Sequence, residues 1–163
     1  MNKLLNYIAF ALLFCTSACS IRTIHKWEPV LPGKIRLYTI KEVLTGDRIK
    51  LASGQIVKYV GIRAPQAGEP FFEKSRKANE WLLSSGRIFL KFIDTDARDR
   101  GYRVYAYSPR REALCFVNEE LLAFGYATFQ DDGLQPDERE KFIEKERLAK
   151  SKKRGLWRFM GEH

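Results

Sequence analysis

The chain of 163 residues contains few histidines and few cysteines. Its two histidines, His25 and His163, lie near opposite ends, which argues against histidine-based acid–base nucleases and against multi-histidine metal sites. Of the three cysteines, Cys15 and Cys19 lie close to the N-terminus and Cys115 stands alone in an apolar run. They provide neither a disulfide framework nor the spacing of a zinc site. Cys115 is therefore expected to be a small buried apolar residue.

Acidic residues are also in deficit. The chain has 20 Asp and Glu against 29 Lys and Arg, which gives a formal net charge of +9 and a pI near 9.6. Such an excess favours polyanionic partners: nucleic acid, an anionic lipid surface or acidic glycans. The alternative is that the charge serves solubility alone. The length and the 45% of hydrophobic residues suit one globular domain of ordinary size.

The apolar run at the N-terminus, Leu4 to Phe14, is short for a membrane span. It follows Lys3 and precedes small residues and Cys19, an arrangement typical of an export signal. We therefore expect residues 1–18 to be a signal peptide and residues 19–33 a polar tether. Cys19 resembles the acylated cysteine of bacterial lipoproteins, although Thr16 stands where leucine is usual. A lipoprotein anchored in the cell envelope and a freely secreted protein both remain open.

Alternating apolar residues predict a first strand from Lys34 to Val43. Residues 49–51 and 56–60 flank a short turn that ends at Gly54, and they predict a hairpin. Residues 88–93 and 103–107 read as two further strands joined by a charged loop. Five short strands with interleaved helices predict an α+β fold over residues 34–160, a five-stranded Greek-key barrel of the oligonucleotide-binding (OB) type.

About three helices are expected. The first begins at Pro70, stops at Gly86 and has an apolar inner side. The second covers residues 117–124, and the third covers residues 138–153. The inner side of the first helix is predicted to carry Phe71, Ala78, Trp81 and Leu82, and that of the third Phe142, Leu148 and Ala149.

Several short motifs, in a fixed order and spacing, resemble those of the staphylococcal nuclease-like (thermonuclease) family. They are Thr45–Arg48, Val57–Gln66, Asp99–Tyr107, Val117–Glu119 with Gly125–Ala127, and Gly155–Trp157. The resemblance covers roughly residues 35–157 and implies the same barrel. It also implies that the barrel binds or cleaves nucleic acid.

Members of this family hold one Ca²⁺ with two aspartates and a backbone carbonyl, and a glutamate activates the attacking water. On this chain, the resemblance places Asp47 at one aspartate and Ala64 at the carbonyl. Arg63 stands at the other aspartate and Gln66 at the glutamate. A positive charge at Arg63 would repel a divalent ion, and Gln66 cannot accept a proton as a general base. Asp47 is then the remaining metal ligand among these side chains.

Two arginines grip the phosphate in the family, and here Lys58 and Arg103 occupy their positions. Lys58 keeps the charge without the bidentate fork. The order Gly101-Tyr102 is reversed from the family pattern, which leaves the direction of Arg103 open. Catalytic positions are therefore assigned to Lys58, Gln66 and Arg103. Arg63 is predicted to hold a phosphate in place of the cation, so that Lys58, Arg63, Arg103 and Tyr102 are predicted to bind nucleic acid.

Two features keep alternatives open. Glu69 either replaces the missing carboxylate or lies at the start of a helix, where it favours the helix dipole. Tyr102, Tyr105 and Tyr107 either stack on bases or pack within the sheet.

The sequence thus predicts an exported protein that binds nucleic acid or another polyanion with little or no hydrolysis and without a cofactor. The first alternative is a Ca²⁺-dependent nuclease that uses Asp47, Glu69 and Arg103. The second is an envelope lipoprotein whose barrel binds another protein. Whether the chain is an enzyme stays open at this point.

Overall fold

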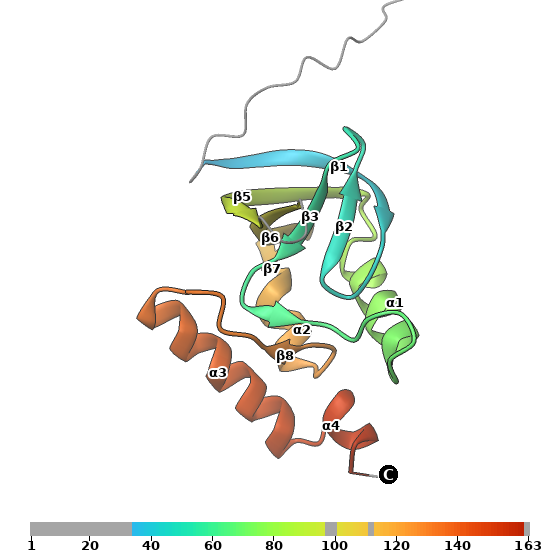
Figure 1. Ribbon diagram of the computed structural model, residues 1–163, viewed down its shortest axis with the longest axis vertical. Coiled ribbons are helices and arrows are strands. Elements are labelled where there is room, and N and C mark those ends of the chain that lie inside the picture. The colour runs from blue at the N-terminus through green and yellow to red at the C-terminus, as the bar shows by residue number, and fades with distance from the viewer. Residues whose placement is uncertain (1–33, 97–100, 111–112, 162–163) are drawn as a thin grey trace, which may run out of the picture.

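The computed structural model describes residues 34–96, 101–110 and 113–161. The predicted signal peptide and tether, with Cys19, lie outside the described residues. In the described part, a β-barrel forms one end of the molecule and helices form the other, and the C-terminus lies at the helical end (Figure 1).

Five of the described strands pair in a closed ring: β1 with β2, β2 with β3, β3 with β6, β6 with β5, and β5 with β1. The pairs are antiparallel except β3–β6, which is parallel and closes the ring. The strands are β1 (Ile35–Val43), β2 (Arg48–Leu51), β3 (Ile56–Tyr59), β5 (Arg87–Asp96) and β6 (Gly101–Arg110). The predicted five-stranded OB barrel is confirmed.

The long strand β1 joins two parts of the ring. Its first half pairs with β5 and its second half with β2, and the register shifts between Ile40 and Glu42. Alternate residues of each strand point into the barrel, as the period of two predicts. On β5 these are Ile88, Leu90 and Phe92, which are buried in the common core.

Three described strands were not predicted. β7 (Ala113–Phe116) extends the sheet beyond β6, and β4 (Ile62–Arg63) pairs with β8 (Thr128–Phe129). Part of the predicted charged loop is strand, because β5 continues to Asp96 and β6 begins at Gly101. Cys115, on β7, is half-buried instead of fully buried, since β7 pairs with β6 alone among the described strands.

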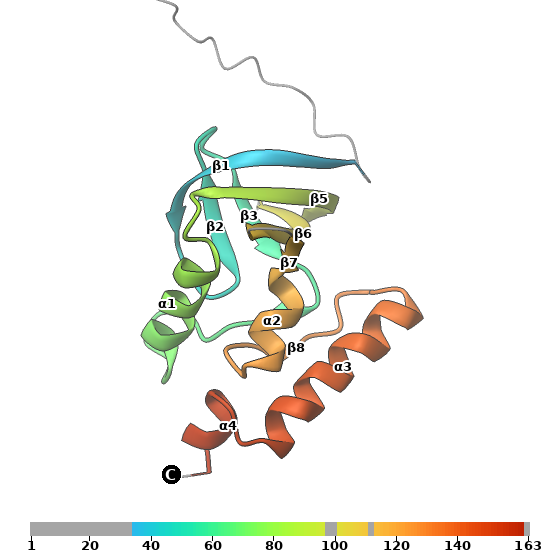
Figure 2. The same cartoon turned by 180° about the vertical axis from the view of Figure 1, so that it is seen from behind.

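The three predicted helices are present: α1 (Phe72–Leu82), α2 (Val117–Ala123) and α3 (Pro136–Ser151). Seen from behind, α2 lies below the barrel between β7 and α3 (Figure 2). A short α4 (Leu156–Phe159) follows. Within the described residues, no helix is long and apolar enough to cross a membrane.

The predicted inner face of α1 is wrong at one residue. The buried residues are Ser75, Asn79 and Leu82, which share one side at spacings of four and three. Trp81 precedes Leu82 by one residue and is therefore rotated about 100° away from that side. Its side chain is 63% exposed. The helix also begins two residues after Pro70, because Phe71 adopts a left-handed conformation with φ of 71°.

The motifs Gly125–Ala127 and Gly155–Trp157 contact each other where α2 ends and α4 begins. The main-chain N–H of Leu156 donates to the carbonyl of Gly125 at 2.8 Å. A Cβ on Gly155 would lie 2.3 Å from that same oxygen, so only glycine permits the contact. The Gly125–Gly155 contact therefore fixes α4 against the end of α2.

Candidate functional site

Asp47 lies in the connection between β1 and β2 and is 1% exposed. Its Oδ1 accepts a hydrogen bond from the Thr45 hydroxyl at 2.6 Å, and its Oδ2 accepts one from the main-chain N–H of Ala64 at 3.1 Å. The preceding Gly46 allows this burial, because a Cβ there would lie 1.9 Å from the Ser75 hydroxyl on α1. The carboxylate is thus held inside the protein by groups of the chain itself.

Gln66 lies next to Asp47 and contacts it through its carboxamide. The Nε2 group donates to the carbonyl oxygen of Ala64 at 2.7 Å and approaches Oδ1 of Asp47 at 3.5 Å. An amide nitrogen only donates hydrogen bonds. The carboxamide therefore lies between the two oxygens that the resemblance assigned to a cation.

The Ca²⁺ ion that the resemblance implies requires six to eight oxygen ligands. Asp47 and the Ala64 carbonyl supply oxygens, but both already accept hydrogen bonds from Gln66. Among the described residues, no three His, Cys, Asp or Glu side chains are grouped so that they could hold a metal ion. Arg63 adds a positive charge where a second carboxylate is needed. This set of donors does not fit Ca²⁺.

Arg63 and Glu69 form an ion pair on the rim of this site. The Nη2 group of Arg63 lies 2.5 Å from Oε1 of Glu69, and both side chains are exposed, at 47% and 40%. The other carboxylate oxygen of Glu69 accepts the main-chain N–H of Gln66 at 2.9 Å. This N–H, together with the Arg63 guanidinium, holds the pKa of the Glu69 carboxyl below its ordinary value. Glu69 therefore contacts Gln66 and Arg63, and it lies three residues before the first residue of α1.

Lys58 and Arg103 lie opposite each other in the parallel pair that closes the barrel. The Arg103 guanidinium is bound by Asp94 on β5, with Nε 2.6 Å from Oδ1. Its Nη1 donates to the carbonyl of Asp132 at 2.6 Å. The direction of Arg103, which the sequence left open, is thus set by its cross-strand neighbour and by the loop before α3. Lys58 is half-buried beside it.

The three tyrosines of β6 pack within the protein. Tyr102 lies edge-on against Phe92, with 5.5 Å between ring centroids, and Tyr107 stacks on Phe116 at 4.7 Å. Tyr105 is 4% exposed. The packing alternative therefore describes these rings, and a role for the half-buried Tyr102 in nucleic-acid binding stays a prediction.

A buried polar network behind Asp47 was missed by the sequence analysis. The Tyr59 hydroxyl donates to Asn79 on α1 at 3.2 Å, and the amide of Asn79 donates to the Thr45 carbonyl at 3.1 Å. Ser75 donates to the carbonyl of Tyr126 at 2.6 Å. Burial raises the pKa of the Tyr59 hydroxyl. The network holds the Asp47 loop against α1. The sequence signal for this network was Thr45, because threonine hydroxyls often bind the backbone two residues further on. Here the Thr45 hydroxyl accepts the main-chain N–H of Asp47.

The closed five-stranded barrel defines a protein of the OB class. The family model described as staphylococcal nuclease homologue matches residues 56–159, which is more than half of the chain. The chain belongs to the staphylococcal nuclease homologue family. The matched region includes Lys58, Arg63, Gln66 and Arg103 and begins after Asp47. A comparison with curated proteins finds no match. The fold is nuclease-like and compatible with nucleic-acid binding.

Proposed function

We propose that this chain is an exported protein that binds nucleic acid or another polyanion and hydrolyses it little or not at all. The observation that carries this proposal is the Gln66 carboxamide between the Ala64 carbonyl and Asp47. A carboxamide does not accept a proton at neutral pH, and the Nε2 group that faces the two oxygens is a donor, which cannot bind a cation. Loss of a general base typically costs about 10²- to 10⁴-fold in rate.

Binding is supported by three basic side chains and by the charge of the chain. Lys58 and Arg103 lie side by side where the barrel closes, and Arg63 lies on β4 beyond the end of β3. Both side chains of the Arg63–Glu69 pair are exposed, and exposed ion pairs contribute little to stability. A phosphate group could therefore displace Glu69 from Arg63 with little loss of stability. It would then accept two parallel hydrogen bonds from the guanidinium.

Export and a lipid anchor belong to the same proposal. The basic start, the apolar run and Cys19 support removal of residues 1–18. Mass spectrometry of the protein from its native membrane or medium should show a chain that starts at or near Cys19, with or without acylation. An intact Met1 in cytosolic material would refute export.

Binding is tested with the purified chain and a labelled duplex oligonucleotide in the presence of a chelator. The affinity should fall steeply with salt, and Arg63→Gln should reduce the slope of log K against log salt by about one unit. The matched control is Arg139→Gln, because Arg139, like Arg63, is an exposed arginine in an ion pair with a carboxylate, here that of Asp131. Affinity that requires Ca²⁺ and ignores salt would contradict the proposal.

The absence of efficient hydrolysis is tested by restoring the family residues. The triple variant Lys58→Arg, Arg63→Asp and Gln66→Glu should show Ca²⁺-dependent cleavage, whereas single changes should do little because the groups act as a unit. Robust Ca²⁺-stimulated cleavage by the unchanged chain would overturn the proposal. Loss of that cleavage in Glu69→Gln would then assign the reaction to Glu69 and favour the nuclease alternative.

A further inference from the structure

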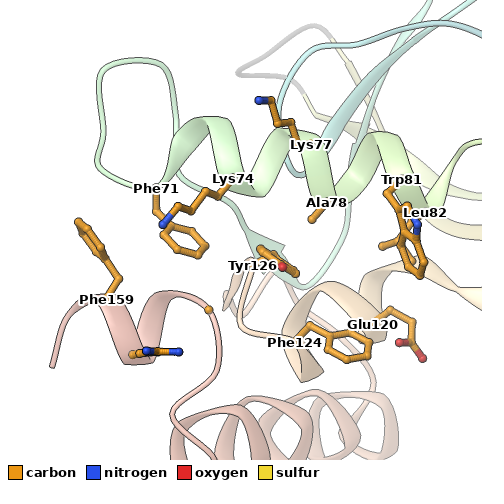
Figure 3. Close-up of a pocket in the computed structure, with 12 residues that line it drawn as sticks. Phe71, Lys74, Lys77, Ala78, Trp81, Leu82, Glu120, Phe124, Tyr126 and Phe159 are labelled. Carbon is orange, nitrogen blue, oxygen red and sulfur yellow. The ribbon is translucent and has the colours of Figure 1, made fainter. Parts of the chain in front are cut away.

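A groove lies at the helical end of the molecule, and neither Asp47 nor the residues that bind its carboxylate line it. We call it the helix groove: one wall is α1, and the other is formed by α2, the segment that follows it, and α4 (Figure 3). Its volume is about 870 Å³. This is within the range of about 300–1,000 Å³ that is typical of ligand sites. The groove is lined mainly by carbon, with five aromatic residues: Phe71, Trp81, Phe124, Tyr126 and Phe159.

The groove is open although its walls are apolar. Trp81 is 63% exposed and Phe124 is 44% exposed. Met160, 52% exposed, lines a smaller hollow that shares Phe159 with the groove. Scattered exposed apolar residues need no explanation, but several large ones around one groove indicate an interaction site. Trp, Tyr, Phe, Met and Arg are also the residue types enriched in protein–protein interfaces.

The floor of the helix groove is formed in advance of any ligand. The Phe71 ring lies between Tyr126 and Phe159, with centroid distances of 5.9 Å and 5.8 Å. The Gly125–Gly155 contact fixes α4, which carries Phe159. Because Tyr126, Phe159 and the Lys74 ammonium all pack on Phe71, this ring does not form an open platform for bases. A preformed apolar groove instead suits apolar side chains.

The charges on the rim of the groove are mostly positive. Lys74, Lys77 and Arg158 line it, against the single acid Glu120. The Lys74 ammonium lies over the Phe71 ring, 5.3 Å from its centroid, and Figure 3 shows its side chain directed into the groove. Within the described part of the chain, the salt bridges of α1 are formed by Arg76 and involve neither of its lysines in the groove. The rim therefore favours an anionic occupant.

We propose that the helix groove binds an amphipathic helix of a partner protein, with apolar side chains between α1 and α2 and acidic side chains along Lys74, Lys77 and Arg158. Helices dock in this way when apolar residues recur at i, i+3, i+4 and i+7. The carbon-lined floor favours this occupant over single-stranded nucleic acid, which needs open ring faces and cations along its whole path. The inference is independent of nucleic-acid binding by the barrel.

The test uses the full chain and two labelled synthetic peptides. One is a helix with leucine at i, i+3, i+4 and i+7 and glutamate beside them, and the other has lysine in place of each glutamate. Fluorescence anisotropy should show the acidic peptide binding at least about ten-fold more tightly. Trp81→Ala should weaken it about ten- to thirty-fold, as expected of an aromatic anchor. The double variant Lys74→Glu/Lys77→Glu should reverse the preference between the peptides.

The matched controls lie outside the groove. Ile143→Ala removes an exposed apolar residue of α3, and Lys152→Glu reverses an exposed charge after α3. Both should leave peptide binding unchanged, and circular dichroism should confirm that every variant is folded. Equal binding of the two peptides, or no effect of Trp81→Ala, would overturn the proposal. A loss of oligonucleotide affinity in Trp81→Ala without any loss of peptide affinity would overturn it too, and would assign the groove to nucleic acid.

Discussion

The Asp47 site and the helix groove, both of which contact α1, differ in how they use their polar groups. At the Asp47 site, a buried carboxylate is bound by Thr45, Ala64 and Gln66. At the helix groove, Trp81 and Phe124 are exposed and the Lys74 ammonium lies over the Phe71 ring. In the Asp47 site the buried carboxylate is hydrogen-bonded by groups of the same chain, whereas in the helix groove apolar side chains are left exposed. The buried polar groups of the Asp47 site thus hold their own loop.

Within the Asp47 site, the largest effect is expected from Asp47→Ala. The change leaves the Thr45 hydroxyl and the Ala64 N–H without their buried acceptor, which should lower the free energy of unfolding by about 3 kcal/mol. Urea unfolding measures it. The control is Asp131→Ala, which removes an exposed aspartate paired with Arg139 and should cost under about 1 kcal/mol. Equal losses in both variants would show that the Asp47 carboxylate does not hold its loop.

A smaller effect is expected from Gln66→Glu. A carboxylate would then face both the Asp47 carboxylate and the Ala64 carbonyl, so stability should fall by about 1–2 kcal/mol in a chelator. Added Ca²⁺ should recover part of the loss, because the ion now meets two acids and a carbonyl. Thermal unfolding with and without Ca²⁺ checks this. The exposed Gln135→Glu is the control and should not respond to Ca²⁺. A Gln66→Glu protein that is as stable as the parent in chelator would contradict the interpretation.

The Arg63–Glu69 pair should give a weak dependence of stability on pH. In the folded state the pKa of the Glu69 carboxyl is lowered from 4.5. The stability that Glu69 contributes is therefore fully present above 4.5 and is lost as the pH falls through the lowered pKa. The stability difference between the parent and Glu69→Gln should therefore be seen at neutral pH and disappear in acid. Urea unfolding at several pH values, with the exposed Glu140→Gln as control, measures it. A stability difference between the parent and Glu69→Gln that grows in acid would contradict the lowered pKa of Glu69.

The smallest effect on stability is expected in the helix groove. Trp81→Ala should change the free energy of unfolding by no more than about 0.5 kcal/mol, because the side chain is largely exposed. Its neighbour Leu82 is 5% exposed, and Leu82→Ala should cost about 2–5 kcal/mol. Urea unfolding of both variants tests the contrast. A large loss in Trp81→Ala would mean that the indole supports the fold and is not surface available to a partner.

Much of the fold followed from local patterns in the sequence. The alternation in β1 and the turn at Gly54 predicted their strands, since both signals lie within a few residues. The parallel β3–β6 pair was not predictable in this way, because its strands are more than forty residues apart in the chain. The inner face of α1 was misjudged since apolar residues were expected there. Ser75 and Asn79 are buried instead, because they find hydrogen-bond partners on other segments.

The sequence predicted which residue types lie in the candidate site, but it did not predict which of their side chains contact one another. The charge and hydrogen-bonding capacity of Arg63 and Gln66 followed from their identities. The sequence did not show that Glu69 binds Arg63 and the Gln66 N–H, because that depends on the turn between them. The direction of Arg103 depended on the register shift between Phe92 and Asp94, which brings Asp94 opposite Arg103. Such shifts leave little trace in a period-two pattern.

Phe159 lines both the helix groove and the smaller hollow of about 310 Å³ that contains Arg63 and Glu69. A ligand that displaces this ring on one side changes the wall available to a ligand on the other. By thermodynamic linkage, the two occupancies would then alter each other's affinity by the same factor. If the proposed partner helix and the proposed anion both bind, Phe159 on α4 is the side chain that both ligands would contact.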